Sequence, residues 1–155
     1  MRRALRIYID TSVIGGCLDD EFKEFSLKLM ERIRTGDFRA VLSEITELEM
    51  IAAPSGVRDI LKDIPTRNLE RVELTKEASA LAGEYITEGV LDKNKLSDAQ
   101  HIAIATVNRV DLVVSWNFKH IVNIRRIAGY NAVNLKAGYP TLDIRSPREV
   151  VSDEE

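Results

Sequence analysis

Cysteine and histidine, the residues that form disulfides and zinc sites, are rare in this sequence. Cys17 is the only cysteine, which excludes an intramolecular disulfide and a cluster of thiolate metal ligands. His101 and His120 are the only histidines, and their spacing is not that of a zinc site. A chain with one cysteine is typical of a reducing compartment, so we expect a cytoplasmic protein.

Long apolar runs and a large net charge are also missing. No apolar stretch approaches the length that crosses a bilayer, so we expect a soluble protein without membrane contact. Arg6 and Asp10 interrupt the apolar part of the N-terminal segment, which argues against a secretory signal peptide. The formal net charge of −3 argues against nucleic-acid binding through overall charge, although it allows a local basic groove.

The composition that remains is that of an ordinary globular domain. The 155 residues are 45% hydrophobic and 30% charged, which is enough to build one self-sufficient core. No internal repeat, low-complexity tract or linker divides the chain. We expect a single domain over residues 1–148 and a frayed acidic tail over residues 149–155.

Strand and helix patterns alternate along the chain. Strand patterns cover residues 5–9, 38–42, 70–74, 111–115 and 141–145. Helix patterns cover residues 21–34, 43–54, 56–64, 75–89, 97–109 and 118–130. Ser43 and Thr75 are candidate N-caps, and Gly89 is a candidate helix stop. The alternation predicts an α/β fold with a mainly parallel sheet.

Polar side chains fall where the predicted strands end. Asp10 follows the first strand, Asn117 follows the fourth, and glutamates lie on the helix after the second. Asp98 begins a helix that we expect at the same edge of the sheet, where functional groups of parallel sheets collect. Crowded carboxylates raise one another's pKa unless a hard cation such as Mg²⁺ binds them. The pattern therefore predicts metal-assisted hydrolysis of phosphodiesters.

Each of these residues also has a purely structural interpretation. Asp10 is a good N-cap for the turn that follows it, and Asp98 stands where helix capping is common. His101 lies inside an apolar helix pattern, where a histidine with satisfied core hydrogen bonds is more frequent than a ligand. The sequence pattern alone leaves both interpretations open.

Four motifs, taken in order, resemble the PIN-domain family, and in particular the VapC-type toxins of prokaryotic toxin–antitoxin systems. They are "YIDTSVIGG", "VLSEITELEMIAAP", "LSDAQHIAIATVNRVDLVVSWNFKHI" and "IRSPREV", which together extend over nearly the whole chain. The resemblance implies a three-layer α/β/α sandwich with a central mainly parallel sheet. It also implies an RNA-cleaving nuclease that uses Mg²⁺ or Mn²⁺, forms a homodimer and has an antitoxin protein as a possible partner.

The resemblance assigns the site residue by residue. Asp10, Glu49 and Asp98 match the family's metal-binding acids, and Asn117 matches a fourth polar position of the catalytic site. Glu47 is the rival of Glu49, because the sequence does not resolve a one-turn adjustment of the helix. On this assignment Asp10 would both bind the metal and orient the attacking water.

One position departs from the family pattern. VapC-like proteins often carry a further aspartate where this chain has His120, which puts two-metal catalysis in doubt. Lys119 and His120 are instead candidates for contact with substrate phosphate. The departure also motivates the alternative of a PIN-fold binding or assembly module with weakened catalysis. A haloacid-dehalogenase-type phosphatase ranks low, since Ser12 stands where that chemistry needs a second aspartate.

Overall fold

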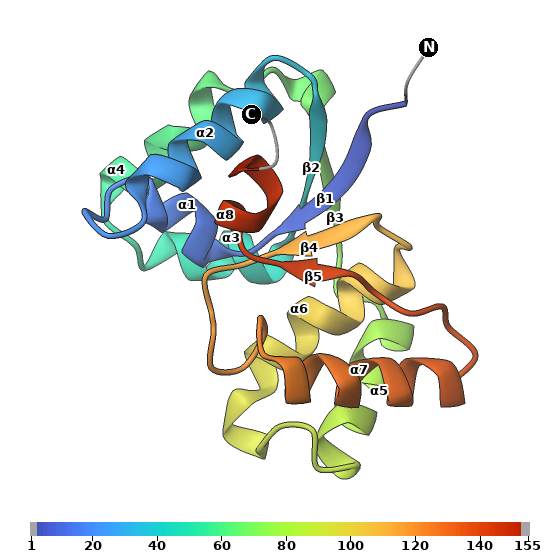
Figure 1. Cartoon of the computed structure of the whole chain (residues 1–155). Coiled ribbons are helices and arrows are strands. Elements are labelled where there is room, and N and C mark those ends of the chain that lie inside the picture. Colours follow the sequence, from blue (N-terminus) through green and yellow to red (C-terminus); the bar gives the residue numbers. More distant parts are fainter. Residues whose placement is uncertain (1–2, 153–155) are drawn as a thin grey trace.

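A parallel five-stranded sheet forms the centre of the computed structural model, which describes residues 3–152 (Figure 1). The strands are β1 (Leu5–Ile9), β2 (Phe38–Ser43), β3 (Leu69–Val72), β4 (Leu112–Val114) and β5 (Ile144–Arg145). Their order across the sheet is β3-β2-β1-β4-β5, and every pairing is parallel. The predicted parallel sheet is therefore confirmed, although β5 is shorter than the strand predicted over 141–145.

Eight α-helices accompany the strands in the described part of the chain. They are α1 (Thr11–Gly16), α2 (Lys23–Arg34), α3 (Glu44–Ile51), α4 (Ser55–Ile60), α5 (Lys76–Thr87), α6 (Leu96–Val107), α7 (Ile124–Lys136) and α8 (Pro147–Val151). Short 3₁₀ turns are η1 (Leu61–Asp63), η2 (Thr66–Asn68) and η3 (Lys93–Lys95). Within residues 3–152, no helix is long and apolar enough to cross a membrane.

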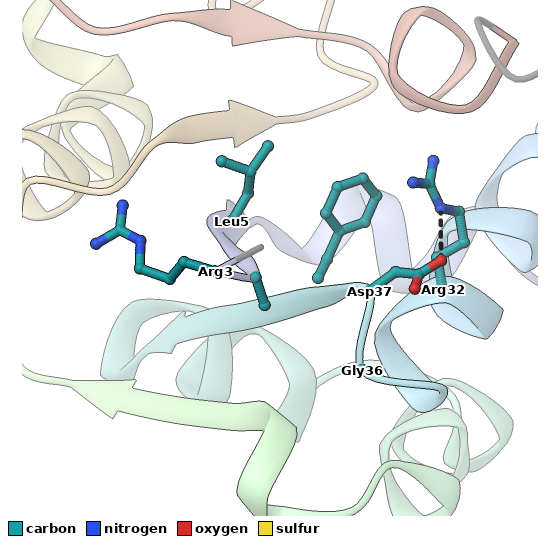
Figure 2. Close-up of a pocket in the computed structure, with 7 residues that line it drawn as sticks. Arg3, Leu5, Arg32, Gly36 and Asp37 are labelled. Carbon is teal, nitrogen blue, oxygen red and sulfur yellow. Dashed lines mark ion pairs between the residues drawn. The ribbon is translucent and has the colours of Figure 1, made fainter. Parts of the chain in front are cut away.

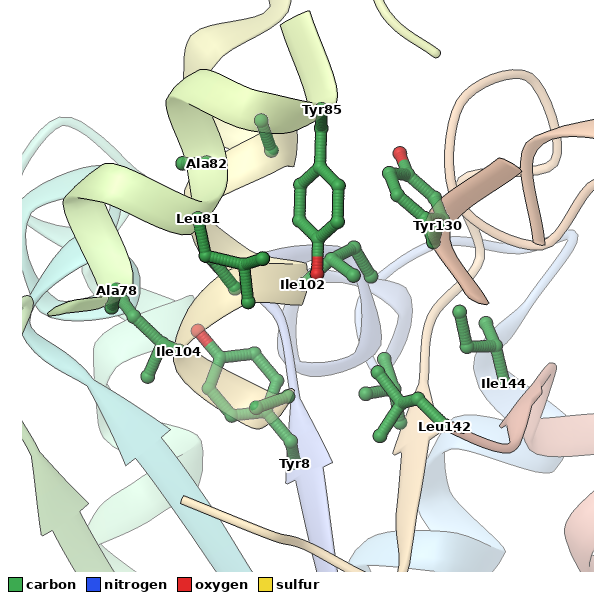
Figure 3. Close-up of a cluster of buried hydrophobic side chains, with 14 of the residues drawn as sticks. Tyr8, Ala78, Leu81, Ala82, Tyr85, Ile102, Ile104, Tyr130, Leu142 and Ile144 are labelled. Carbon is green, nitrogen blue, oxygen red and sulfur yellow. The ribbon is translucent and has the colours of Figure 1, made fainter. Parts of the chain in front are cut away.

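The helices cover both faces of the sheet, which confirms the predicted α/β/α sandwich. Helices α1, α2, α4 and α8 lie on one face, and α5, α6 and α7 lie on the other (Figure 1). Alternate residues of β1 supply the two cores: Ile7 and Ile9 pack toward α1 and α2, whereas Tyr8 packs toward α5 and α6. Figure 3 shows the second core, in which Tyr8 lies near Leu81 and Ile104.

Local signals in the sequence explain most helix boundaries. The Ser43 side chain accepts hydrogen bonds from two amides of α3, and the Thr75 side chain accepts one from Ala78 N of α5. Gly89 follows α5 with a φ of 79°, a left-handed conformation that glycine adopts without strain. These predicted caps are confirmed.

The loop before α7 and the C-terminal segment are two of the places where the structure differs from the sequence prediction. Residues 118–123 are not helical: Asn117 O accepts hydrogen bonds from Ile121 N and Val122 N in one turn that is not continued, and the Asn123 side chain caps the later start of α7. Residues 149–151 of the predicted tail are helical instead, since residues 147–151 form α8 with a capping box between Ser146 and Glu149. Residues 153–155 of that predicted tail lie outside the described residues.

Candidate functional site

Asp10 ends β1 and begins α1, so it occupies the carboxyl edge of the sheet and also caps a helix. Its Oδ1 accepts hydrogen bonds from Ser12 Oγ at 2.6 Å and from Val13 N at 3.4 Å. Its Oδ2 accepts a hydrogen bond from Ser115 Oγ at 2.6 Å, just beyond β4. The capping role considered from the sequence is therefore present, together with the position at the sheet edge.

The Asp10 carboxyl group is almost fully removed from water, with 5% of the residue exposed. Burial raises its pKa, and the opposing effects of His101, Ser115 and Ser12 do not bring the pKa back to the ordinary range. A buried acid of this kind is stabilised by any positive charge that reaches it.

Glu49 lies on α3 and is held by three donors from two other elements. Thr11 Oγ1 donates to Oε1 at 2.7 Å, Ser97 Oγ donates to Oε2 at 3.0 Å, and His101 Nε2 lies 2.8 Å from Oε1. Partial burial raises the pKa of Glu49, but His101, Thr11 and Ser97 outweigh it and lower the pKa to about 2. The carboxylate is therefore kept ionised.

The other glutamates of α3 are engaged elsewhere. Glu47 Oε2 lies 2.5 Å from Arg71 Nη1, and Glu44 Oε1 accepts a hydrogen bond from Leu74 N at 2.6 Å. Neither shares a partner with Glu49. Of the two rival positions, the structure brings Glu49 rather than Glu47 toward α1 and α6.

Asp98 lies in the first turn of α6 and meets the residue that follows β4. Asn117 Nδ2 donates to Asp98 Oδ1 at 3.3 Å. Asn117 Oδ1 accepts hydrogen bonds from Lys119 N at 3.2 Å and His120 N at 2.9 Å, so this amide also organises the loop. Asn117 therefore connects an acid on α6 with the loop between β4 and α7.

Asp10, Glu49 and Asp98 are electrostatically coupled, and we call them the acidic cluster. Burial raises the pKa of Asp98; His101 and His120 oppose that rise, and Asp10 and Glu49 add to it. Asp10 and Glu49, which come from distant sequence segments, thus disfavour ionisation of Asp98 at one edge of the sheet.

Sequence reasoning missed the role of His101 in this site. The residue is 2% exposed, so the interpretation as a buried, hydrogen-bonded histidine is correct. Its Nδ1 lies 2.6 Å from Tyr8 Oη, while Nε2 faces Glu49. A signal for this was available, because His101 is three residues after Asp98 and so lies on the same face of α6.

The donor chemistry of the acidic cluster fits a hard divalent cation, because carboxylate oxygens are the ligands that Mg²⁺ prefers. The like-charge coupling at Asp98 is also the penalty that such a cation would remove. Within residues 3–152, however, no three His, Cys, Asp or Glu side chains form a ready metal-binding group. Instead, hydroxyl, amide and imidazole groups of the protein hold the oxygens of Asp10 and Glu49. The metal site remains a prediction.

A separate cavity of about 700 Å³ lies at the opposite edge of the sheet, where β1 and β2 begin (Figure 2). Arg3, Arg32, Asp37 and Phe38 are among its lining residues. Arg32 pairs with Asp37 at 3.5 Å, and its guanidinium lies over the Phe38 ring. This cavity does not include the acidic cluster.

Comparison with protein families adds an independent finding. The model of the PIN domain family matches residues 7–120, which extend from β1 to His120 and contain all of the acidic cluster. No curated protein sequence matches the chain.

Three solved structures illustrate the likeness in fold. DNA-bound VapBC from Salmonella typhimurium has a TM-score of 0.56 at 16% identity, covering 92% of this chain and 98% of that chain. FitAcB from Neisseria gonorrhoeae has a TM-score of 0.56 at 14% identity, covering 91% and 97%. VapC20 from Mycobacterium tuberculosis, a sarcin-ricin loop cleaving toxin, has a TM-score of 0.53 at 13% identity, covering 88% and 98%. At such identities the likeness concerns the fold alone.

Proposed function

The chain belongs to the PIN domain family, and from this premise we propose that it is a metal-dependent endoribonuclease similar to VapC toxins. The observation that carries the proposal is the acidic cluster, in which Asp10, Glu49 and Asp98 come from three elements and the charges of Asp10 and Glu49 disfavour ionisation of Asp98. A buried acid such as Asp10 is costly to ionise unless a cation binds it, and cation binding is what phosphodiester hydrolysis needs.

The acidic cluster would hold Mg²⁺ or Mn²⁺, and the chemistry such a cation supplies when bound is Lewis-acid activation of the phosphodiester and of water. Neighbouring side chains fix the orientation and the ionisation of these carboxylates. Ser12 and Ser115 fix the orientation of Asp10, while His101 keeps Glu49 ionised and Asn117 orients Asp98. Asp10 is the residue we assign to orienting the attacking water, and the products would carry a 3′-hydroxyl and a 5′-phosphate.

We also propose the assembly that the family suggests. VapBC complexes are among the proteins with a similar fold, which supports an antitoxin protein as a partner of this chain. A homodimer is likewise part of the proposal.

The test of the proposed activity is Asp10→Asn, assayed for cleavage of single-stranded RNA with Mg²⁺ or Mn²⁺. We expect cleavage to be abolished and the melting temperature to be unchanged or raised. Burial makes the ionised carboxylate of Asp10 costly in free energy, and asparagine carries no charge. Asp37→Asn is the matched control, since Asp37 lies at the other edge of the sheet. The Asp37→Asn variant should cleave RNA as fast as wild type. An Asp10→Asn variant as fast as wild type contradicts the proposal.

A second candidate function is a binding or assembly module without catalysis. It is favoured by His120, an uncharged or cationic ring beside Asp98 at a position where related proteins often have an acid. A titration with Mg²⁺ and Mn²⁺ discriminates the two functions, since a bound cation stabilises the folded state by mass action. If millimolar Mg²⁺ or Mn²⁺ leaves the melting temperature unchanged, the binding or assembly module is favoured.

A further inference from the structure

A group of positive charges lies beside the acidic cluster, on the side of Asp98. The loop that carries them is joined to Asp98 through Asn117, whose Nδ2 donates to Asp98 Oδ1 at 3.3 Å and whose Oδ1 accepts hydrogen bonds from Lys119 N at 3.2 Å and His120 N at 2.9 Å. His120 Nδ1 is itself buried and has no hydrogen-bond partner among residues 3–152. The loop after β4 therefore brings Lys119 and His120 to the side of the acidic cluster that Asp98 forms.

The same loop opens onto a cavity of about 610 Å³ at the start of α7. Lys119, Asn123, Arg125 and Arg126 line it together with Glu88. Glu88 is the one acid of this lining, and Lys136 neutralises it through an ion pair of 2.6 Å. The cavity therefore carries a net positive charge, although the chain as a whole is acidic.

The cationic side chains that line this cavity differ in whether they already have a partner in the protein. Arg126 is fixed by a hydrogen bond from Nη1 to Val90 O. Lys119 and Arg125 are exposed, and in the described part of the chain neither side chain makes an ion pair. Two unpaired cations at one concave surface can contact an anion without breaking an existing bond.

The helix terminus itself is not the source of this binding capacity. Asn123 Oδ1 already accepts hydrogen bonds from Arg125 N at 3.1 Å and Arg126 N at 3.2 Å. Any anion in the cavity would therefore be bound mainly by the side chains of Lys119 and Arg125.

An exposed aromatic residue that precedes Lys119 in the same loop, although it does not line the cavity, favours a nucleic-acid strand over a simple anion. Phe118 is 50% exposed, and its ring lies edge-on to Trp116 at a centroid distance of 6.0 Å. Trp116 in turn stacks on Phe22 at 4.4 Å, so Phe118 rests on an ordered aromatic support. Exposed aromatics next to cations are the usual platform for unpaired bases of single-stranded RNA.

We propose that the cavity formed by Lys119, Asn123 and Arg125 is a subsite for a backbone phosphate of single-stranded RNA, adjacent to the acidic cluster. The subsite rests on the proposed ribonuclease function, because it positions the strand whose phosphodiester meets Asp10, Glu49 and Asp98. Lys119 and Arg125 contact the phosphate, and Phe118 stacks on a neighbouring base. The cations thereby offset the repulsion between the RNA and the acids.

The test measures binding separately from cleavage. A fluorescently labelled single-stranded RNA of mixed sequence is titrated with the protein in EDTA, so that the affinity does not depend on catalysis. The double variant Lys119→Gln/Arg125→Gln is compared with Arg34→Gln/Arg67→Gln, which removes the same charge near the loops that precede β2 and β3. Thermal unfolding of both variants verifies that these exposed substitutions leave the fold intact.

We expect the Lys119→Gln/Arg125→Gln variant to bind RNA about tenfold more weakly than wild type at moderate salt. The slope of log affinity against log salt should fall by about 0.7, since both cations contact the same phosphate and each neutralised phosphate of a single strand contributes about 0.7. The Arg34→Gln/Arg67→Gln variant should bind as wild type does.

The outcomes separate the subsite from the proposed function. Unchanged RNA affinity in the Lys119→Gln/Arg125→Gln variant, or a wild type that binds no RNA, overturns the subsite even where wild type cleaves RNA with added metal. Affinity that depends on these two residues supports the subsite even where wild type cleaves nothing, and in that case only the catalytic proposal fails.

Discussion

His101 Nε2 lies 2.8 Å from Glu49 Oε1, although the two residues are 52 positions apart in the sequence. The other ring nitrogen, Nδ1, lies 2.6 Å from Tyr8 Oη, and Tyr8 is fully buried at the middle of the sheet. Because an ionised carboxylate can only accept, Nε2 carries the proton that is shared with Glu49. A buried polar chain therefore links the centre of the sheet to the acidic cluster and holds one of its members in place.

Replacing His101 should change the ionisation of Glu49. In His101→Leu the hydrogen bond and electrostatic effect of the ring are lost, while partial burial and the bonds from Thr11 and Ser97 remain, so the pKa of Glu49 should rise from about 2 toward its ordinary value of 4.5. A pH titration of the ¹³C-labelled glutamate carboxyl groups by NMR measures this.

His120→Leu is the matched control for that experiment. His120 faces Asp98 and is not among the groups that chiefly set the pKa of Glu49, so Glu49 should titrate as in wild type. A His101→Leu protein in which Glu49 still titrates near its wild-type value contradicts the positioning role of His101.

The ion pair between Arg6 and Glu70 should make stability depend on pH. Arg6 Nη2 lies 2.7 Å from Glu70 Oε2, and Arg6 Nε donates to Oε1 at 3.0 Å, so β1 and β3 are joined across β2. The hydrogen bond from Arg6 lowers the pKa of Glu70 below its ordinary value of 4.5, burial opposes that effect, and the charges of Arg6 and Arg39 add to it.

A carboxyl group with a lowered folded-state pKa stabilises the fold above its unfolded pKa, and the benefit disappears as pH falls through the folded value. Glu70→Gln should therefore lower the free energy of unfolding by about 1 kcal/mol at pH 7, a modest figure because both side chains are partly exposed. Urea denaturation at several pH values tests this. A difference that persists unchanged well below pH 4.5 argues against the ion pair as its cause.

The parts of the fold that follow from local patterns could be predicted from the sequence. Residues 5–9 alternate in a way that places Ile7 and Ile9 on one face and Tyr8 on the other, as found. Ser43 and Thr75 are short polar residues just before apolar helix patterns, and both cap helices. The position of Asp10 at the carboxyl edge follows from the same reasoning, because parallel strands end together.

Features that depend on distant partners could not be predicted. The helical pattern over 118–130 included the apolar Ile121 and Val122, but the structure forms only a turn there, and α7 begins after Asn123, whose side chain caps it. Glu47 and Glu49 are two residues apart on a helix, about 200° around its axis, so only the orientation of α3 decides which one faces His101. That orientation is set by the packing of α3 against α1 and α6.

Helix α1 was missing from the sequence prediction, since six residues ending in two glycines have low helix propensity. Contacts with other parts of the chain stabilise α1, and the surroundings of Gly16 show how closely these parts pack against the helix. A Cβ at Gly16 would lie 2.5 Å from Ser26 Oγ and 2.8 Å from Trp116 Nε1, two side chains that are hydrogen-bonded to each other at 2.8 Å.

Gly16→Ala should therefore destabilise the protein by about 1–3 kcal/mol through overpacking. Gly15→Ala is the matched control, because nothing lies within 4 Å of its Cβ position and alanine is the better helix former. We expect that control to gain about 0.5–1 kcal/mol. Chemical denaturation of the two variants measures both effects. Equal stability of the two alanine variants would mean that α1 is not held by the contact of Gly16 with Ser26 and Trp116, and that the N-cap position of Asp10 has another support.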